Sequence, residues 1–181
     1  MRTILPIPKG MSREVQSDLL LIRWSWRKSG NVHLVTFLVF IWNALMLGWF
    51  FKTPINWRVL TLNEVFPMLT VVIGLILAYF WFAAWFNTTE LEITAKQIHV
   101  RIGPVPWRRD IYLAREGIVD VIYRERVNQG YSSTFDVLTV TGDGTETRLI
   151  CGLLKYEVVV FYVREIRAFL GLPDATLSPD A

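Results

Sequence analysis

Apolar positions follow different patterns in successive regions of the chain. Two long blocks, residues 29–51 and 65–89, contain no Asp, Glu, Lys or Arg over 23 and 25 residues respectively. At about 1.5 Å of rise per residue, a helix of either length spans the roughly 30 Å hydrocarbon layer of a bilayer. The alternative is a pair of buried core helices, for which this short chain offers little covering surface. The pattern favours two transmembrane helices, and the short linker 52–64 makes them an antiparallel hairpin.

Residues 1–28 form a different region, an amphipathic arm. Ser12 is expected to cap a short helix that continues to Leu21. After this helix, Trp24 and Trp26 alternate with polar residues, which is typical of a short strand or of a segment lying in the headgroup layer. The arm carries six basic and two acidic residues. This positive charge is expected either to attract an anionic membrane surface or simply to flank the first helix.

From residue 90 onward, short runs of alternating apolar and polar residues are separated by turn signals, as in β-strands. The expected strands are 90–94, 98–102, 107–113, 118–127, 134–141 and 146–151. Over 154–170 the apolar period becomes helical, and Gly171 followed by Pro173 ends the helix. Region 90–181 is therefore predicted to be an antiparallel β meander that curls into a sandwich or partly open barrel, with one C-terminal capping helix.

Basic residues near the ends of the two blocks predict the orientation of the hairpin. The flank before the first block and the segment after the second are rich in Lys and Arg, whereas the linker has only Lys52 and Arg58. By the positive-inside rule, both termini and the β-rich region are expected in the cytoplasm.

Composition and charge argue against several classes of function. The chain has 52% hydrophobic and 19% charged residues and a net charge of +3, and region 90–181 alone has 11 basic and 13 acidic residues. That balance argues against nucleic-acid binding. With one cysteine and two histidines, the chain has no disulfide, no cysteine-rich zinc site and no nucleophile paired with a base. We expect a protein that is not an enzyme and that has no metal site and no cofactor of its own.

The three most reactive side chains have simple structural interpretations. His99 is expected on the outward face of a strand. His33 is expected at the inner membrane interface, although it is also a candidate ligand of a tetrapyrrole metal or contact of a partner. Cys151, at the end of a strand, is expected to be a small buried apolar side chain.

Three segments carry a resemblance to a known group of proteins. They are NTTELEITAKQIHVRIGPVPW at 87–107, which includes a Gly-Pro-x-Pro turn, YRERV at 123–127 and the closing FLGL at 169–172. Together with the two apolar blocks, they resemble small uncharacterised bacterial proteins in which a second transmembrane helix runs directly into a pleckstrin-homology-like (PH-like) domain. The resemblance implies a PH-like fold for 90–181 and a location in the bacterial cytoplasmic (inner) membrane. Its motifs are architectural and imply no activity.

Aromatic residues are denser in the arm and in both blocks than an interface belt requires. Large rigid rings dominate binding interfaces, so these residues are candidates for contacts with other integral-membrane proteins. The candidates are Trp24, Trp26, Trp42, Trp49, Trp81 and Trp85. The predicted function is a non-catalytic accessory or scaffold subunit, for example in a large bacterial respiratory or photosynthetic complex, where pigments or quinones contact it through the partner.

The alternative function is a membrane-tethered PH-like module that senses anionic lipid headgroups. Its candidate residues are Arg101, Arg108 and Arg109, which equally fit ordinary solvated strand charge. The scaffold is the first prediction because a domain that two helices already anchor gains little from recruitment by lipid.

Overall fold

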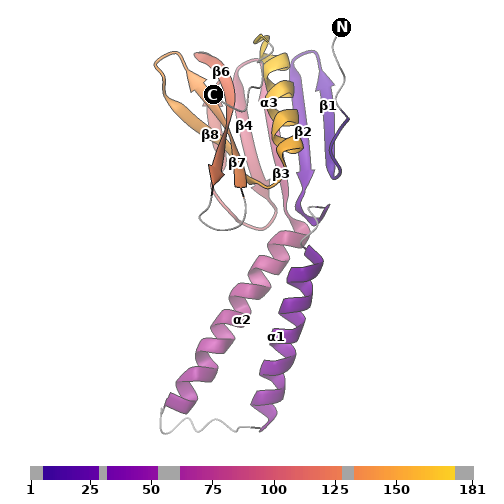
Figure 1. The fold of residues 1–181 in the computed structure, drawn as a ribbon, viewed down its shortest axis with the longest axis vertical. Coiled ribbons are helices and arrows are strands. Elements are labelled where there is room, and N and C mark those ends of the chain that lie inside the picture. The colour runs from indigo at the N-terminus through magenta and orange to yellow at the C-terminus, as the bar shows by residue number, and fades with distance from the viewer. Residues whose placement is uncertain (1–5, 29–31, 53–61, 128–132, 174–181) are drawn as a thin grey trace. The chain divides into compact units, whose positions relative to one another are not determined.

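The computed structural model describes residues 6–28, 32–52, 62–127 and 133–173, which fall into two compact units. The β unit contains the chain up to Trp24, Thr89–Ile102 and the chain from Arg108 onward. The hairpin unit contains Ser25–Thr88 and Gly103–Trp107. Figure 1 shows sheets with one helix in the β unit and two long helices in the hairpin unit.

Two helices, α1 (Val32–Lys52) and α2 (Leu62–Phe86), make up most of the hairpin unit. They lie side by side (Figure 1), and both are long and apolar enough to cross a membrane. They are antiparallel, because Thr36 near the start of α1 contacts Trp81 near the end of α2. The predicted antiparallel hairpin is therefore confirmed, while linker residues 53–61 lie outside the described part of the chain.

Helix α2 ends at Phe86, three residues before the end of the predicted span at residue 89. Asn87 leaves the helix, and its carbonyl oxygen accepts a hydrogen bond from the Trp26 N–H at 3.1 Å. Thr88 already begins a strand. The last part of the predicted span is wrong because Thr88 and Thr89 continue the alternation of the following strand, and threonine favours extended backbone.

The strands form two antiparallel sheets. The five-stranded sheet has the order β1 (Met11–Gln16), β2 (Leu19–Ser25), β3 (Thr88–Thr94), β4 (Gln97–Gly103), β5 (Ile111–Ala114). The three-stranded sheet has the order β6 (Ile118–Val127), β7 (Ser133–Thr141), β8 (Glu146–Leu153), and α3 (Tyr156–Leu170) follows it. All six strands predicted after residue 89 and the closing helix are present. Only β5 is clearly shorter than predicted, since it begins at Ile111.

The arm differs from its prediction. The expected helix from Ser12 to Leu21 is wrong, because β1 and β2 pair there as a hairpin in which Met11 faces Trp24 and Gln16 faces Leu19. The physical reason is burial. In β2, Leu20 and Ile22 alternate with more exposed residues and reach 1% and 0% exposure in the core, which a strand allows and a helix would not.

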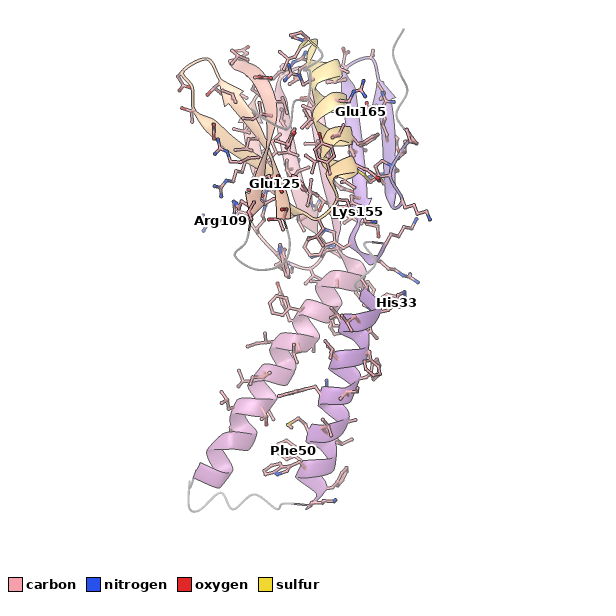
Figure 2. All side chains as sticks on the ribbon, viewed as in Figure 1. His33, Phe50, Arg109, Glu125, Lys155 and Glu165 are labelled. Atoms are coloured by element: carbon pink, nitrogen blue, oxygen red, sulfur yellow. The ribbon has the colours of Figure 1, made fainter. Side chains whose placement is uncertain are left out.

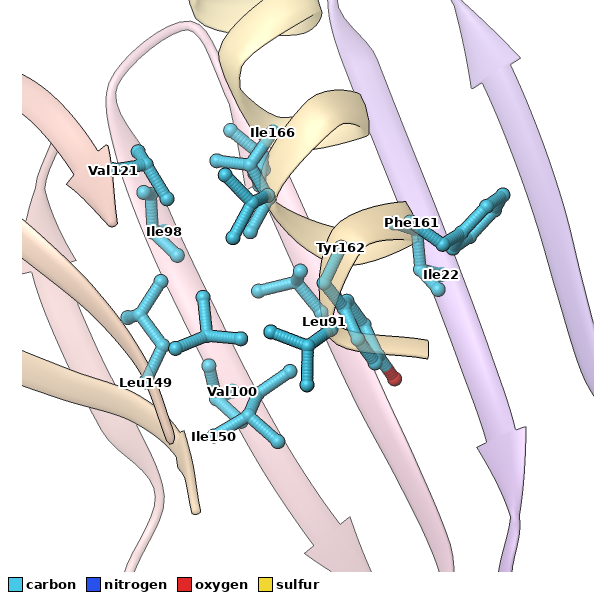
Figure 3. Close-up of a cluster of buried hydrophobic side chains, with 14 of the residues drawn as sticks. Ile22, Leu91, Ile98, Val100, Val121, Leu149, Ile150, Phe161, Tyr162 and Ile166 are labelled. Atoms are coloured by element: carbon cyan, nitrogen blue, oxygen red, sulfur yellow. The ribbon is translucent and has the colours of Figure 1, made fainter. Parts of the chain in front are cut away.

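The core of the β unit lies between the two sheets and α3. Figure 3 shows Tyr162 and Ile166 of α3 pointing toward Leu91, Val100 and Ile150, which come from both sheets. Burying one such side chain contributes about 1.5–3 kcal/mol. Helix α3 ends as predicted: Gly171 adopts φ = 75°, and the Leu172 N–H bonds to the Arg167 carbonyl at 2.9 Å.

One buried carboxylate ties the strands of the smaller sheet together. Asp136 on β7 is 3% exposed. It accepts a hydrogen bond from Arg126 on β6 at 2.6 Å and another from the Gly152 N–H on β8 at 3.0 Å. A buried charge needs such partners, so Asp136 holds these three strands in register.

Candidate functional site

The tryptophans near the end of α2 point at α1. The indole N–H groups of Trp81 and Trp85 both donate to Thr36 Oγ1 at 2.9 Å, and this hydroxyl donates to the Val32 carbonyl at 2.8 Å. A spacing of four residues places both rings on one face of α2. Two of the six predicted partner-binding residues therefore pack within the hairpin.

Trp42 and Trp49 of α1 also have contacts inside the hairpin unit. The Trp42 indole N–H donates to the Thr70 carbonyl at 3.4 Å. Gly74 lies beside it, and a Cβ added there would be 3.5 Å from Trp42 Nε1, so glycine allows close approach of the helices. The Trp49 ring meets the Phe50 ring edge-on, with centroids 5.6 Å apart. All four helix tryptophans are half-buried.

On the two helices, the rings that face outward are phenylalanines and a tyrosine rather than tryptophans. We call them the outer aromatic surface: Phe37, Phe40, Phe51, Tyr79, Phe80, Phe82 and Phe86, each at least 44% exposed. Phe82 and Phe86 are 49% and 55% exposed, and their rings stack at 5.9 Å. Figure 2 shows side chains projecting outward along both helices. The sequence showed the density of rings but not which of them face outward.

Asn87 joins three segments of the hairpin unit. It is fully buried, and its Oδ1 accepts a hydrogen bond from the Val105 N–H at 2.7 Å, while its backbone contacts Trp26 and Ala83. Its Nδ2 group has no hydrogen-bond partner among the described residues. The sequence analysis did not assign Asn87 this role. The only available signal was a polar residue at the boundary between an apolar block and a strand.

Aromatic and basic side chains gather around this junction. Trp26 and Trp107 meet edge-on with centroids 5.0 Å apart, and Phe80 lies 5.5 Å from Trp107. The guanidinium of Arg27 lies 4.6 Å above the Trp85 ring, a favourable cation–π distance. These residues are of the types that occur at the boundary between hydrocarbon and water.

Trp24, the remaining candidate of the arm, belongs to the β unit. It is half-buried and packs against the core of that unit. The two tryptophans of the arm therefore have different surroundings, although they are only two residues apart.

The three predicted lipid-binding arginines are not equivalent. Arg108 donates to the Leu149 carbonyl at 2.6 Å and lies 3.5 Å from Cys151 Sγ, so its guanidinium is engaged within the β unit. Arg101 and Arg109 are exposed, and no ion pair joins either of them to a described residue. The structure does not bring all three together as one group of available charges.

His99 lies on the outward face of β4, as predicted, but it is well partnered. Its Nε2 is 3.2 Å from Asp110 and its Nδ1 is 3.9 Å from Glu92. Its ring stacks on Tyr112 with centroids 4.2 Å apart. No group of three or more His, Cys, Asp or Glu in the described ranges is placed to hold a metal ion.

A surface groove of about 410 Å³ runs between β1 and α3. Arg13 pairs across it with Glu165 at 2.8 Å, and the Arg115 guanidinium lies 5.7 Å from the Phe169 ring. Figure 2 labels Glu165 on α3. Because these contacts engage both guanidinium groups, the groove offers no pair of available positive charges.

The prediction that Cys151 is buried is wrong. The residue is exposed, although it follows the buried Leu149 and Ile150. The reason is a bulge at Leu149, the extra residue between the pairs Val137–Ile150 and Leu138–Arg148, which lets Leu149 and Ile150 be buried in succession. The bulge reverses the alternation and turns Cys151 outward.

The Tyr162 hydroxyl lies in the core of the β unit. Tyr162 is fully buried and its hydroxyl has no hydrogen-bond partner among the described residues. Burial raises the pKa of the Tyr162 hydroxyl far above its ordinary range, because the charged form would lose its solvation. This group is therefore unsuited to exchange protons near neutral pH.

No protein-family model and no curated protein matches this chain. The candidate site therefore rests on the geometry of the hairpin unit, namely the outer aromatic surface and the aromatic junction around Asn87.

Proposed function

We propose that this chain is a non-catalytic integral-membrane scaffold subunit that binds another membrane protein through its two helices. In this proposal α1 and α2 cross the bacterial cytoplasmic membrane, both termini are cytoplasmic, and the β unit is a PH-like domain. Membrane lipids surround the part of the hairpin that the partner does not cover. Any pigment or quinone is held by the partner complex.

One observation supports the proposal. The tryptophans of the two helices contact residues within the hairpin, whereas the rings of the outer aromatic surface are exposed. Trp81 and Trp85 use their N–H groups on Thr36, whereas Phe82 and Phe86 stack on each other and face outward. Phe82 and Phe86 lie in the last turns of α2, where an interfacial belt uses Trp and Tyr, while protein interfaces also favour phenylalanine as a large, rigid aromatic group. The best candidate contact is therefore Phe82 and Phe86.

Co-purification tests this proposal. Membranes that contain the full chain are solubilised gently, and mass spectrometry identifies the proteins that accompany it. We expect a stoichiometric partner. Changing Phe82→Leu together with Phe86→Leu keeps both positions apolar, so insertion should persist while the partner is lost, since each hot-spot ring contributes about 2 kcal/mol or more.

The matched control is Phe37→Leu together with Phe40→Leu, because these rings are 62% and 66% exposed on the other helix. This variant should keep the partner. The proposal is overturned if the wild-type chain purifies without any partner, or if the Phe82 and Phe86 variant retains every partner at wild-type yield.

Trp81 and Trp85 remain predicted partner-binding residues, but their contacts with Thr36 change the effect expected from replacing them. Replacing both with Leu also removes two hydrogen bonds to Thr36, so the hairpin itself is expected to weaken. Loss of the partner in that variant is meaningful only if the hairpin still forms.

The lipid-sensing alternative is supported by the exposure of Arg101 and Arg109. It predicts that anionic phospholipid co-purifies with the chain and decreases when both residues are changed to Ala. The scaffold proposal predicts no change. Native mass spectrometry of the wild-type and double-variant proteins measures the bound lipid directly.

A further inference from the structure

Three exposed arginines lie on one face of the smaller sheet. Arg124 and Arg126 come from β6 and Arg148 from β8, and their side chains are 52%, 45% and 53% exposed. The register pairs all three with even-numbered residues of β7, whereas the odd-numbered Val137 packs in the core. Because alternate residues of a strand point to opposite sides, the three arginines lie on the side of the sheet away from the core. We call this side the arginine face.

The acidic residues of these strands do not balance the accessible positive charge. Asp136 is buried, and the Glu146 side chain is 35% exposed. Glu125 alternates with the arginines of β6 and therefore points to the other side, and Asp120 bonds to Arg167 of α3. Among the described residues of β6, β7 and β8, the arginine face thus presents three accessible positive charges and one accessible negative charge. This is the reverse of region 90–181 as a whole, which has 11 basic and 13 acidic residues.

The guanidinium groups keep donors that their ion pairs with described residues do not use. Arg124 donates through one Nη to Glu146 at 2.7 Å, and Arg126 donates through one Nη to Asp136 at 2.6 Å. The Nε of Arg148 is 3.8 Å from an oxygen of Asp136. A guanidinium has five N–H groups, so each can bind a further carboxylate. An exposed ion pair contributes little to stability, so a carboxylate of a partner can also replace Glu146 on Arg124.

The spacing of the arginines indicates the form of the ligand. Arg124 and Arg126 are two residues apart on one strand, which separates their backbones by about 7 Å. Alternate side chains of an extended polypeptide repeat at the same distance, so two acidic residues can meet both arginines at once. A single phosphate would require the guanidinium groups to converge. Their separate ion pairs with Glu146 and Asp136 oppose this.

We propose that the arginine face binds an extended acidic segment of another protein, in which Asp or Glu occupies alternate positions. Two carboxylates of the segment bind Arg124 and Arg126, and Arg148 adds positive charge on the side of β8. Complementary charge of this kind accelerates association and selects the partner. The contact uses the β unit alone, so it is independent of the helix contacts in the proposed function.

Fluorescence anisotropy with the full chain in an uncharged detergent tests this face. The probe is a labelled peptide in which Glu and Ser alternate, and the same peptide with Gln in place of Glu is the control. The Glu peptide should bind, with an affinity that falls as the salt concentration rises, and the Gln peptide should not.

A double variant tests the residues. Arg124→Gln together with Arg148→Gln should weaken binding of the Glu peptide by roughly fivefold or more, because two exposed charge pairs are lost. Arg126 is left unchanged because it is a partner of the buried Asp136. The matched control is Arg23→Gln together with Arg101→Gln, which removes the same charge from exposed positions of the larger sheet and should bind the peptide like the wild type.

Glu146→Gln gives a test in the opposite direction. It removes the acid that competes for Arg124, so the peptide should bind roughly twofold more tightly. The proposal is wrong if this variant does not bind more tightly, if the Gln peptide binds as well as the Glu peptide, or if the variant of Arg124 and Arg148 binds like the wild type. It is also wrong if that double variant loses bound phosphatidylglycerol in native mass spectrometry but keeps the peptide, since the face would then bind lipid.

Discussion

Helices α3 and α1 differ both in composition and in what covers their apolar side chains. Helix α3 buries seven of its 15 residues inside the β unit, and charged residues such as Glu157 and Arg164 occupy its other side. Helix α1 buries only two of its 21 residues, Val32 and Val39, and has no charged residue before Lys52. The apolar surface of α3 is covered by its own unit, whereas most apolar side chains of α1 are exposed.

The same substitution in the two helices should therefore have very different effects on stability. Phe161 of α3 is 1% exposed, and Phe40 of α1 is 66% exposed. Phe161→Ala should lower the free energy of unfolding by about 3–5 kcal/mol, because it opens a cavity in a packed core. Phe40→Ala should change it by less than about 0.5 kcal/mol, as expected for an exposed position.

Denaturant unfolding of the solubilised chain, followed by near-ultraviolet circular dichroism, measures both variants. Phe161→Leu is a second core variant that keeps the fold if Phe161→Ala prevents it. Equal losses at positions 161 and 40 would mean that α1 is also covered by protein within one chain, and the contrast between the helices would be wrong.

A smaller effect is expected from the charges of the β unit. Asp136→Asn should cost about 2 kcal/mol, because a buried carboxylate that accepts charge-assisted bonds becomes a neutral amide beside Arg126. Glu146→Gln is the matched control, since its side chain is 35% exposed and pairs with the exposed Arg124. That change should cost only tenths of a kcal/mol. Thermal unfolding of both variants tests the difference.

Within the β unit, the strands after residue 89 and the N-terminal arm differ in how well the sequence predicted them. The strands after residue 89 were predictable, because their alternation already matches the pleat of a sheet with one buried face. The arm was not, since the run Leu19, Leu20, Leu21 and Ile22 is compatible with a helix or a strand. This segment is a strand because it pairs with β1, to which a two-residue turn connects it.

In the hairpin, the sequence predicted the lengths of the helices but not the direction of their faces. A spacing of four placed Trp81 and Trp85 on one side, yet only the partner helix shows that this side meets Thr36. The exposure of Cys151 was likewise hidden, because the bulge at Leu149 is set by the pairing of β8 with β7. Contacts between distant residues set these features, and local periodicity does not report them.

Thr36→Val should have a more modest effect, confined to the hairpin unit. The change keeps the shape of the side chain and removes the hydroxyl that accepts the indole N–H groups of Trp81 and Trp85. It should weaken the α1–α2 contact by about 1 kcal/mol, since hydrogen bonds between membrane helices average about 0.6 kcal/mol each. Thr36→Ser keeps the acceptor and should behave like the wild type. Tryptophan fluorescence during unfolding in mixed micelles measures the stability of the α1–α2 contact. An unchanged transition for Thr36→Val would contradict this prediction.

The smallest expected effect is a pH dependence of stability that arises in the turn between β7 and β8. Helix α1 has no acidic residue and therefore no such contribution. The Thr141 hydroxyl, which donates to Asp143, and the Thr145 N–H and hydroxyl lower the pKa of the Asp143 carboxyl from 3.8 to about 2. The folded state therefore prefers the ionised form, and this contribution is complete above pH 3.8 and is lost as the pH falls toward 2. Asp143→Asn should flatten the dependence of the unfolding midpoint on pH in that window, while both proteins should behave alike at lower pH. Parallel curves for wild type and variant across the window would show that the turn does not hold its carboxylate in this way.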